Sequence, residues 1–180
     1  REKYVKHLYK KLQREGQLER DVDRLVRNDR IAWGASMIAC NDADAMVTGN
    51  IRHYAASIEK LKKVVDPRPG EEIFGMTMIN SKGKTILVAD TNVQDFPSAQ
   101  RLVNVSKSCV RVARLFGFDP KVAFLSHSTF GKPVSKNTKH VRDAIEILKK
   151  EKVDFDFDGE MQPDVALNPI YQEIYPFSKI

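Results

Sequence analysis

A run of hydroxyl residues with one glycine is the segment of this chain best suited to bind an anion. It reads SHSTFGK over residues 126–132, between a short apolar run and a helical pattern. Small residues let backbone N–H groups approach an anion, and a following helix adds the positive end of its dipole. Ser128 and Thr129 could donate hydroxyl hydrogen bonds, while Lys132 and Lys136 add positive charge. The residues alone fit an ordinary loop that caps a helix equally well.

A second candidate segment covers residues 47–54 and reads VTGNIRHY. Its glycine suits a tight exit from a strand. Arg52 could clamp a phosphate or a carboxylate through two parallel hydrogen bonds. The alternative is a surface arginine beside a half-buried tyrosine, and nothing else in the segment decides between them.

Carboxylates mark a third candidate segment, residues 156–161, which reads DFDGEM. At the end of a strand, such groups could hydrogen-bond a ligand, orient a basic residue or act as a general base. Ion pairs with nearby lysines would give the same pattern, because structural networks resemble active sites. We take the structural role as the default for this segment.

Several common chemistries have no signature here. The chain contains no G-x-G-x-x-G, no G-x-x-x-x-G-K-[ST] and no G-x-S-x-G. The two cysteines, Cys40 and Cys109, and the four histidines show no metal-ligand spacing, so we expect no metal site. Both cysteines lie in apolar helical patterns and are expected to be free thiols in a cytoplasmic protein.

Three helices are predicted for the first 40 residues. Tyr4, Leu8 and Leu12 lie four residues apart, which places them on one face of a helix. A second helix follows Gly16. Asp29 then has the position of an N-cap for a third helix, which is apolar around most of its circumference and is expected to be deeply buried.

Strands and helices alternate through the rest of the chain. We expect strands at residues 43–49, 73–79, 85–89, 122–125 and 153–157, and helices at residues 55–65, from Pro97 to Gly117, and around residues 141–148. The run at 122–125 is apolar without alternation, as in a strand covered on both faces. This order predicts an α/β fold with a mainly parallel sheet, to which one hairpin adds an antiparallel edge. Ligands of such sheets collect at the carboxyl ends of the strands, where the three candidate segments lie.

Composition limits the class of protein further. The chain has 180 residues and is 42% hydrophobic, which suits one domain or part of a larger one. Its formal net charge of +6 fits either a solvated basic surface or an attraction for anionic ligands. The positive charges are dispersed, so we expect no nucleic-acid partner. No apolar run reaches about 18 residues, so no membrane span is expected. The chain opens as if inside a helix, which suggests a piece of a longer protein.

Four segments resemble the phosphate acetyl/butyryl transferase family in order and spacing. They are ADAMVTG at 43–49, ADT at 89–91 with Pro97 downstream, LSHSTFG at 125–131 and DGEM at 158–161. The resemblance covers nearly the whole chain. Four further features resemble the form of this domain that is fused to NADP-dependent malic enzymes: RNDR at 27–30, RHY at 52–54, GEM at 159–161 and YPFSK at 175–179.

The resemblance implies a fold and a site. The fold would be an isocitrate/isopropylmalate dehydrogenase-like, three-layer α/β domain with a mainly parallel sheet, present in part. Residues 1–42 would be the helical part of a first subdomain and residues 43–180 mostly the second. The family's Ser-x-Ser-Thr-x-Gly loop and first strand exit map onto this chain and, with Arg52 and Glu160, give the candidate contacts to acyl phosphate or coenzyme A. These are Thr48, Gly49, Arg52, Ser126, Ser128, Thr129, Gly131 and Glu160.

The resemblance also implies a division of labour. The family's catalytic Ser–Arg pair and aspartate base would lie after residue 180, so we assign no catalytic residue and expect the chain alone to be inactive. The domain would bind acetyl-CoA as a regulator and support a homo-oligomer, with NADP and a divalent metal held elsewhere in the malic enzyme. An active phosphate acetyltransferase and a mere assembly module are the alternatives.

Overall fold

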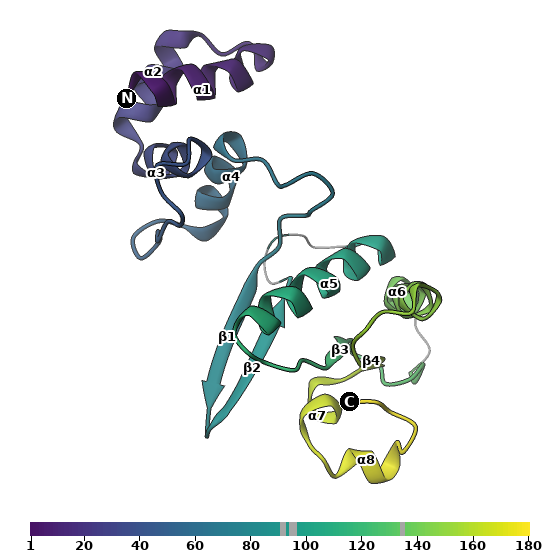
Figure 1. Cartoon of the computed structure of the whole chain (residues 1–180). Helices are drawn as coiled ribbons and strands as arrows, with labels where there is room; N and C mark the ends of the chain where they lie inside the picture. Colours follow the sequence, from purple (N-terminus) through teal and green to yellow (C-terminus); the bar gives the residue numbers. More distant parts are fainter. Residues whose placement is uncertain (91–92, 94–96, 134–135) are drawn as a thin grey trace. The chain divides into compact units, whose positions relative to one another are not determined.

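The computed structural model describes residues 1–90, 93, 97–133 and 136–180 (Figure 1). The chain divides into two compact units, Arg1–Arg68 and Pro69–Ile180. This division falls later in the chain than the subdomain boundary that we placed after residue 42. The helix predicted at residues 55–65 is therefore part of the first unit.

The first unit is built from helices that share one apolar core. They are α1 (Glu2–Leu12), a 3-10 turn at Gln13–Glu15, α2 (Glu19–Asn28), α3 (Arg30–Ala39) and α4 (Tyr54–Val64). Tyr4, Leu8 and Leu12 are buried on one face of α1, as their spacing predicts. Val22 and Val26 of α2 join them in the core.

Asp29 begins α3, as the sequence predicts. Its side chain accepts hydrogen bonds from the N–H groups of Ile31 (2.9 Å) and Ala32 (3.2 Å), two of the amides that the first turn of a helix leaves unpaired. Burial of α3 is less complete than its composition suggests. One face is buried, but Trp33 is 37% exposed and packs edge-on against Tyr4.

The strand predicted at residues 43–49 is wrong. The segment runs without regular secondary structure, and Val47 is fully exposed. A strand needs a neighbour to pair its backbone groups. Within residues 1–68 the structure has helices alone, so this segment has no strand beside it in its own unit.

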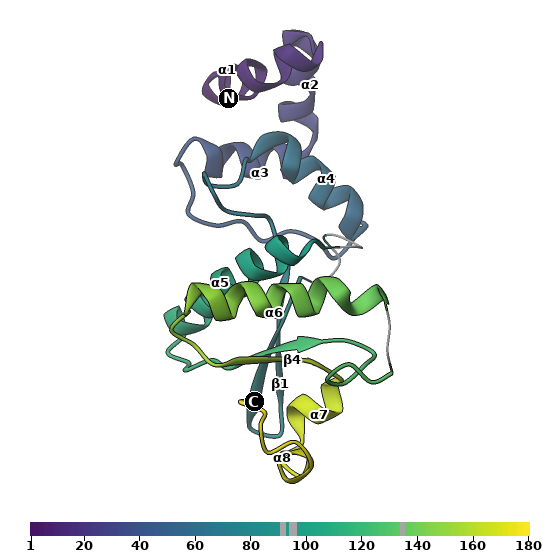
Figure 2. The ribbon, with the colours of Figure 1, turned by 90° about the vertical axis from the view of Figure 1, so that its right-hand side faces the viewer.

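The second unit combines a hairpin, a parallel pair of strands and several helices. Its elements are β1 (Met76–Ser81), β2 (Lys84–Ala89), α5 (Ala99–Leu115), β3 (Val122–Leu125), a 3-10 turn at Lys136–Thr138, α6 (Lys139–Glu151), β4 (Phe157–Met161), α7 (Pro163–Leu167) and α8 (Tyr171–Ile174). Helices α5 and α6 pack side by side, and α6 packs on β4. The pair β3–β4 has α5 and α6 on one side and α7 and α8 on the other (Figures 1 and 2).

The predicted hairpin is confirmed, but it forms a two-stranded sheet of its own and is not an edge of the sheet that β3 and β4 form. Strands β1 and β2 are antiparallel, and Ser81 pairs with Lys84 across a two-residue turn. The turn residues, Lys82 and Gly83, both have positive φ (50° and 77°). Such turns match the twist of the strands that they join. Helix α5 is found two residues later than predicted, because Ser98 is its N-cap and Pro97 precedes that cap.

The parallel pair β3–β4 is joined through α6, which makes a β-α-β unit. Strand β3 lies where the sequence places it. Its expected burial on both faces is not found, because Leu125 is 46% exposed while Phe124 is buried. The strand predicted at residues 153–157 is wrong, since β4 begins only at Phe157. Val153 and Phe155 pack against the core of α6 instead, so their alternation reflects burial without strand pairing.

Candidate functional site

The loop that follows β3 and the end of β4 form one site in the second unit. Parallel strands end at the same edge of a sheet, which brings residues 126–132 beside Glu160 and Met161. The N–H of Ser126 donates to the carbonyl of Met161 at 2.9 Å, which fixes the start of the loop. The sequence predicted contacts in both segments, and the structure brings Ser126, Ser128, Thr129, Gly131 and Glu160 together.

The tip of this loop is a tight turn. Thr129 and Lys132 exchange backbone hydrogen bonds of 2.9 and 3.0 Å. The residues between them, Phe130 and Gly131, both have positive φ (46° and 84°). Only glycine adopts this conformation without steric cost, so Gly131 suits the turn and Phe130 is held there by its surroundings.

The amide groups of the loop are turned toward the protein. The Ser128 N–H donates to Ser126 Oγ (3.2 Å), and the Thr129 N–H donates to the Lys132 carbonyl. The N–H groups of Phe130 and Gly131 donate to the backbone oxygen (2.7 Å) and to Oε1 (3.1 Å) of Glu160. These amides therefore do not form the anion cradle that the sequence suggested. A ligand at this edge would meet side chains, among them the exposed His127 and Lys132.

Glu160 lies at the centre of the site, and its side chain is completely buried. Oε1 accepts hydrogen bonds from Ser128 Oγ (2.9 Å), the Gly131 N–H and Arg142 Nη1 (2.8 Å), with Thr138 Oγ1 farther away at 3.4 Å. Within the described part of the chain, Oε2 has no hydrogen-bond partner. Glu160 thus binds the protein's own loop. The Ser128 side chain is fully buried, and its hydroxyl donates to this carboxylate.

Segments after β4 hold the loop from its other side. The Phe130 ring packs against Tyr175 and Phe177, with ring centroids 5.2 and 4.8 Å away. Gln162 donates its backbone N–H to Thr129 Oγ1 (3.2 Å) and its side-chain Nε2 to the His127 carbonyl (2.8 Å). The loop is therefore fixed both by β4 and by the chain that leaves it.

The other three predicted contacts, Thr48, Gly49 and Arg52, belong to the first unit. Thr48 and Gly49 are exposed in the irregular segment before α4. Arg52 forms an ion pair with Asp29 (Nη1 to Oδ2, 3.0 Å), and Lys60 forms a second, short one with the same oxygen. Arg52 thus has a carboxylate partner within the protein, and its role toward a phosphate remains a prediction.

The charge state of Asp29 follows from these contacts. Burial by itself would raise its pKa, but hydrogen bonds from Lys60, the Ala32 amide, Arg52 and the Ile31 amide outweigh burial and hold the pKa well below its usual range. Asp29 is therefore ionised at neutral pH. A cleft of about 510 Å³ lies beside it and is lined by Asp29 together with residues of α1, α2, α3 and α4, among them Lys60.

Sequence reasoning missed the role of Arg142 and Thr138. Both contact Glu160, and Arg142 Nη1 also donates to Thr138 Oγ1 (2.9 Å). Their spacing of four residues at the start of a helix puts them on one face. That spacing was visible, but the buried carboxylate that they share lies 18 residues or more farther along the chain, and only the parallel pairing of β3 and β4 reveals it.

Cys109 is not an activated nucleophile. Burial, assisted by the negative charge of Asp90, raises the pKa of its thiol to about 12. In a Cys40→Ser variant, whose only thiol is Cys109, we expect alkylation by iodoacetamide at pH 8 to be at least about 100-fold slower than in urea, because so little thiolate is present. Equal rates with and without urea would contradict this.

Two classes of site have no support among the residues that the structure describes. No group of three or more histidine, cysteine or acidic side chains is arranged to hold a metal ion. In the same residues, no helix combines the length and the apolar character that crossing a membrane requires.

A family model and similar known proteins point to the same family. The model of the family described as "Phosphate acetyl/butaryl transferase" matches residues 1–180. An NADP-dependent malic enzyme of Rhizobium meliloti is 44% identical over 98% of this chain, and a phosphate acetyltransferase of Nitratidesulfovibrio vulgaris is 30% identical over 81% of it. The chain spans only 23% and 21% of the length of these two relatives.

A solved structure supports the same assignment. The phosphotransacetylase of Streptococcus pyogenes superposes with a TM-score of 0.79 at 27% identity, over 95% of this chain and 53% of that one. The α/β phosphotransacetylase fold implied by the sequence motifs is thus confirmed. Because the family model covers the chain from its first residue to its last, the chain belongs to the phosphate acetyl/butaryl transferase family.

Proposed function

We propose that the chain is the phosphotransacetylase-like domain of an NADP-dependent malic enzyme, a longer protein that oxidatively decarboxylates malate to pyruvate. In that protein the domain binds acetyl-CoA as a regulator and supports a homo-oligomer. The similarity to malic enzymes over 98% of the chain supports this proposal, as does the small share of their length that the chain spans. NADP and the divalent metal belong to the remainder of the longer protein.

The observation that carries the ligand proposal is the loop at the carboxyl edge of β3 and β4. Ligands of α/β folds bind at this edge. Here the loop carries the partly exposed hydroxyls of Ser126 and Thr129 next to the exposed side chains of His127 and Lys132. Hydroxyl donors and a cation suit the phosphate groups of an acyl-CoA.

Glu160 is not placed to act as a catalytic base within this chain. A thiol of coenzyme A needs a base before it can attack an acyl phosphate. Glu160 is the carboxylate at the carboxyl edge of β4, but it is buried and already accepts hydrogen bonds from Arg142, Ser128 and Gly131. It is therefore a poor base for an incoming thiol. The runner-up function is an active phosphate acetyltransferase, which the names of some relatives favour.

Calorimetry on the longer protein tests the regulatory proposal. Acetyl-CoA is expected to release or absorb heat with one saturable site per chain, and to change the rate of malate decarboxylation. A Lys132→Ala variant should bind about threefold to tenfold more weakly, because one charge-assisted contact is lost. Lys149→Ala, which removes an exposed lysine from the last turn of α6, is the matched control. No heat with the unsubstituted protein would leave only an assembly role.

An acetyltransferase assay tests the expectation that this chain alone is inactive. With acetyl phosphate and coenzyme A, the 180-residue chain is expected to give no turnover above the uncatalysed background. Reproducible turnover, lost on heating the protein, would refute the regulatory assignment for this chain and support the enzyme.

A further inference from the structure

Glu160 connects three segments of the second unit. Strand β4 carries it, the loop after β3 donates to it through Ser128 and Gly131, and the start of α6 donates through Arg142. Its side chain is fully buried among them. A single carboxylate oxygen thereby fixes the loop relative to the helix that follows it.

The two amides at the tip of the loop both depend on this residue. The Phe130 N–H donates to the backbone oxygen of Glu160 (2.7 Å), and the next amide, that of Gly131, donates to its side chain (3.1 Å). With both amides facing β4, the orientation of the turn is set. The neighbouring side chains of His127 and Lys132 then face solvent, where both are exposed.

Charge makes this arrangement depend on a carboxylate. Arg142 supplies a positive charge 2.8 Å from Oε1, while its side chain is 40% exposed. Removal of Glu160 would take away the carboxylate oxygen that accepts from both the buried Ser128 hydroxyl and the Gly131 N–H. Buried donors without a partner are costly, so the loop would reorganise to find other acceptors.

From these contacts we infer that Glu160 is a positioning residue for the ligand-binding loop. It sets the conformation of residues 126–132 and does not itself touch the ligand. This inference rests on the proposed function, in which that loop binds the phosphates of acetyl-CoA. It replaces the direct ligand contact that the sequence suggested for Glu160.

The test follows two readouts in Glu160→Ala and in the milder Ser128→Ala, which removes one donor to Oε1. The first is hydrogen exchange of the Phe130 and Gly131 amides in the 180-residue chain, compared with amides in the core of α6 such as that of Ile145. The second is the affinity of the longer protein for acetyl-CoA. Glu146→Ala is the matched control, because it removes an exposed carboxylate from α6 whose ion pair is with Lys149, away from the loop.

We expect exchange at the loop amides to accelerate by about tenfold or more in Glu160→Ala and by about threefold to fivefold in Ser128→Ala. Exchange at Ile145 should change by less than about twofold in Ser128→Ala. Acetyl-CoA affinity should fall in the same order, while Glu146→Ala leaves both readouts unchanged. Should Glu160→Ala fail to fold, Ser128→Ala decides by itself.

Two results would overturn the inference: loop amides that remain as protected as in the unsubstituted chain, or accelerated exchange with unchanged affinity. A different failure belongs to the proposed function. If the unsubstituted longer protein does not bind acetyl-CoA, regulation is refuted, and the exchange rates alone show whether Glu160 sets the loop.

Discussion

Gly159→Ala is expected to lower the stability of the second unit by roughly 3 kcal/mol, because two separate costs coincide at this position. Gly159 lies in β4 opposite Phe124, with a φ of 142° that side-chain-bearing residues rarely adopt. A Cβ there would lie 2.6 Å from the Phe124 carbonyl oxygen and 3.0 Å from its Cβ. Backbone of a paired strand cannot move aside as a flexible side chain can, so the parallel pair itself must shift.

Urea unfolding followed by far-UV circular dichroism measures this loss, and exchange of the β3 and β4 amides localises it. Gly117→Ala is the control, because Gly117 also has positive φ (80°) but has open space around the position of the added Cβ. It should cost only the conformational term, about 1–2 kcal/mol. Similar losses in both variants would mean that the contact with Phe124 has no energetic weight.

The consequence reaches the candidate site. Glu160 follows Gly159 directly, so a shift of β4 would move the carboxylate that holds the loop. Gly159→Ala should therefore also speed the exchange of the Gly131 amide, whereas Gly117→Ala should not. The packing of β3 against β4 therefore also determines the geometry of the loop at 126–132.

Helices and their caps were predictable because their signals are local. The spacing of Tyr4, Leu8 and Leu12 describes one face of α1, and Asp29 is a favourable N-cap by its side-chain type alone. The hairpin was predictable for the same reason, since a short polar segment that contains Gly83 separates its two strands. In each case the deciding contacts lie within a few residues of one another.

Strand predictions were wrong where strand formation depends on a partner that is distant in the sequence. Residues 43–49 have the apolar, small-residue pattern of a strand, but no strand pairs with them within their unit. Val153 and Phe155 alternate as strand residues do, yet they pack on the core of α6, and β4 starts where the alternation ends. Hydrophobic alternation reports burial on one side; it does not report a hydrogen-bonded neighbour.

The candidate site shows the same limit. The sequence drew attention to the loop at 126–132 and to Glu160 separately, and the structure joins them. The sequence could not show that the amides of Phe130 and Gly131 donate to Glu160, because this residue lies in a strand about 30 residues later. Which side of a loop faces its ligand is a property of pairing between strands.

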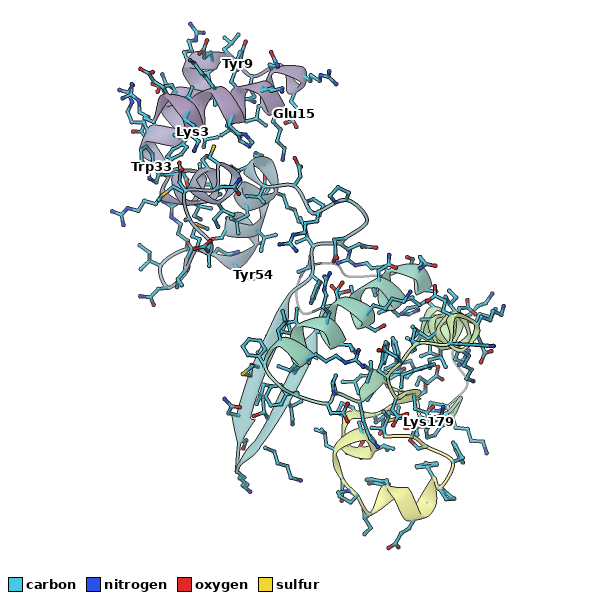
Figure 3. All side chains as sticks on the ribbon, viewed as in Figure 1. Lys3, Tyr9, Glu15, Trp33, Tyr54 and Lys179 are labelled. Atoms are coloured by element: carbon cyan, nitrogen blue, oxygen red, sulfur yellow. The ribbon has the colours of Figure 1, made fainter. Side chains whose placement is uncertain are left out.

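Asp29→Asn separates the two roles that this carboxylate has in the first unit. Asparagine can still cap α3, but it loses the ion pairs with Arg52 and Lys60. We expect a loss of about 1–2 kcal/mol for Asp29→Asn and about 3 kcal/mol for Asp29→Ala, which also removes the cap. The only tryptophan, Trp33 on α3, reports this unit directly (Figure 3), so urea unfolding can be followed by its fluorescence.

The pH dependence of stability tests whether the charge of Asp29 causes the loss in Asp29→Asn. A carboxyl group whose pKa is lowered by folding contributes stability that is fully present above its unfolded pKa of about 3.9 and is lost as the pH falls toward the folded value. The deficit of Asp29→Asn should therefore be constant between about pH 7 and pH 5 and should shrink below about pH 4. Arg27→Ala, which affects an exposed ion pair with Asp23 in the same unit, should change stability by less than about 1 kcal/mol. A deficit in Asp29→Asn that persists undiminished at pH 3 would show that lost packing, and not lost charge, destabilises the variant.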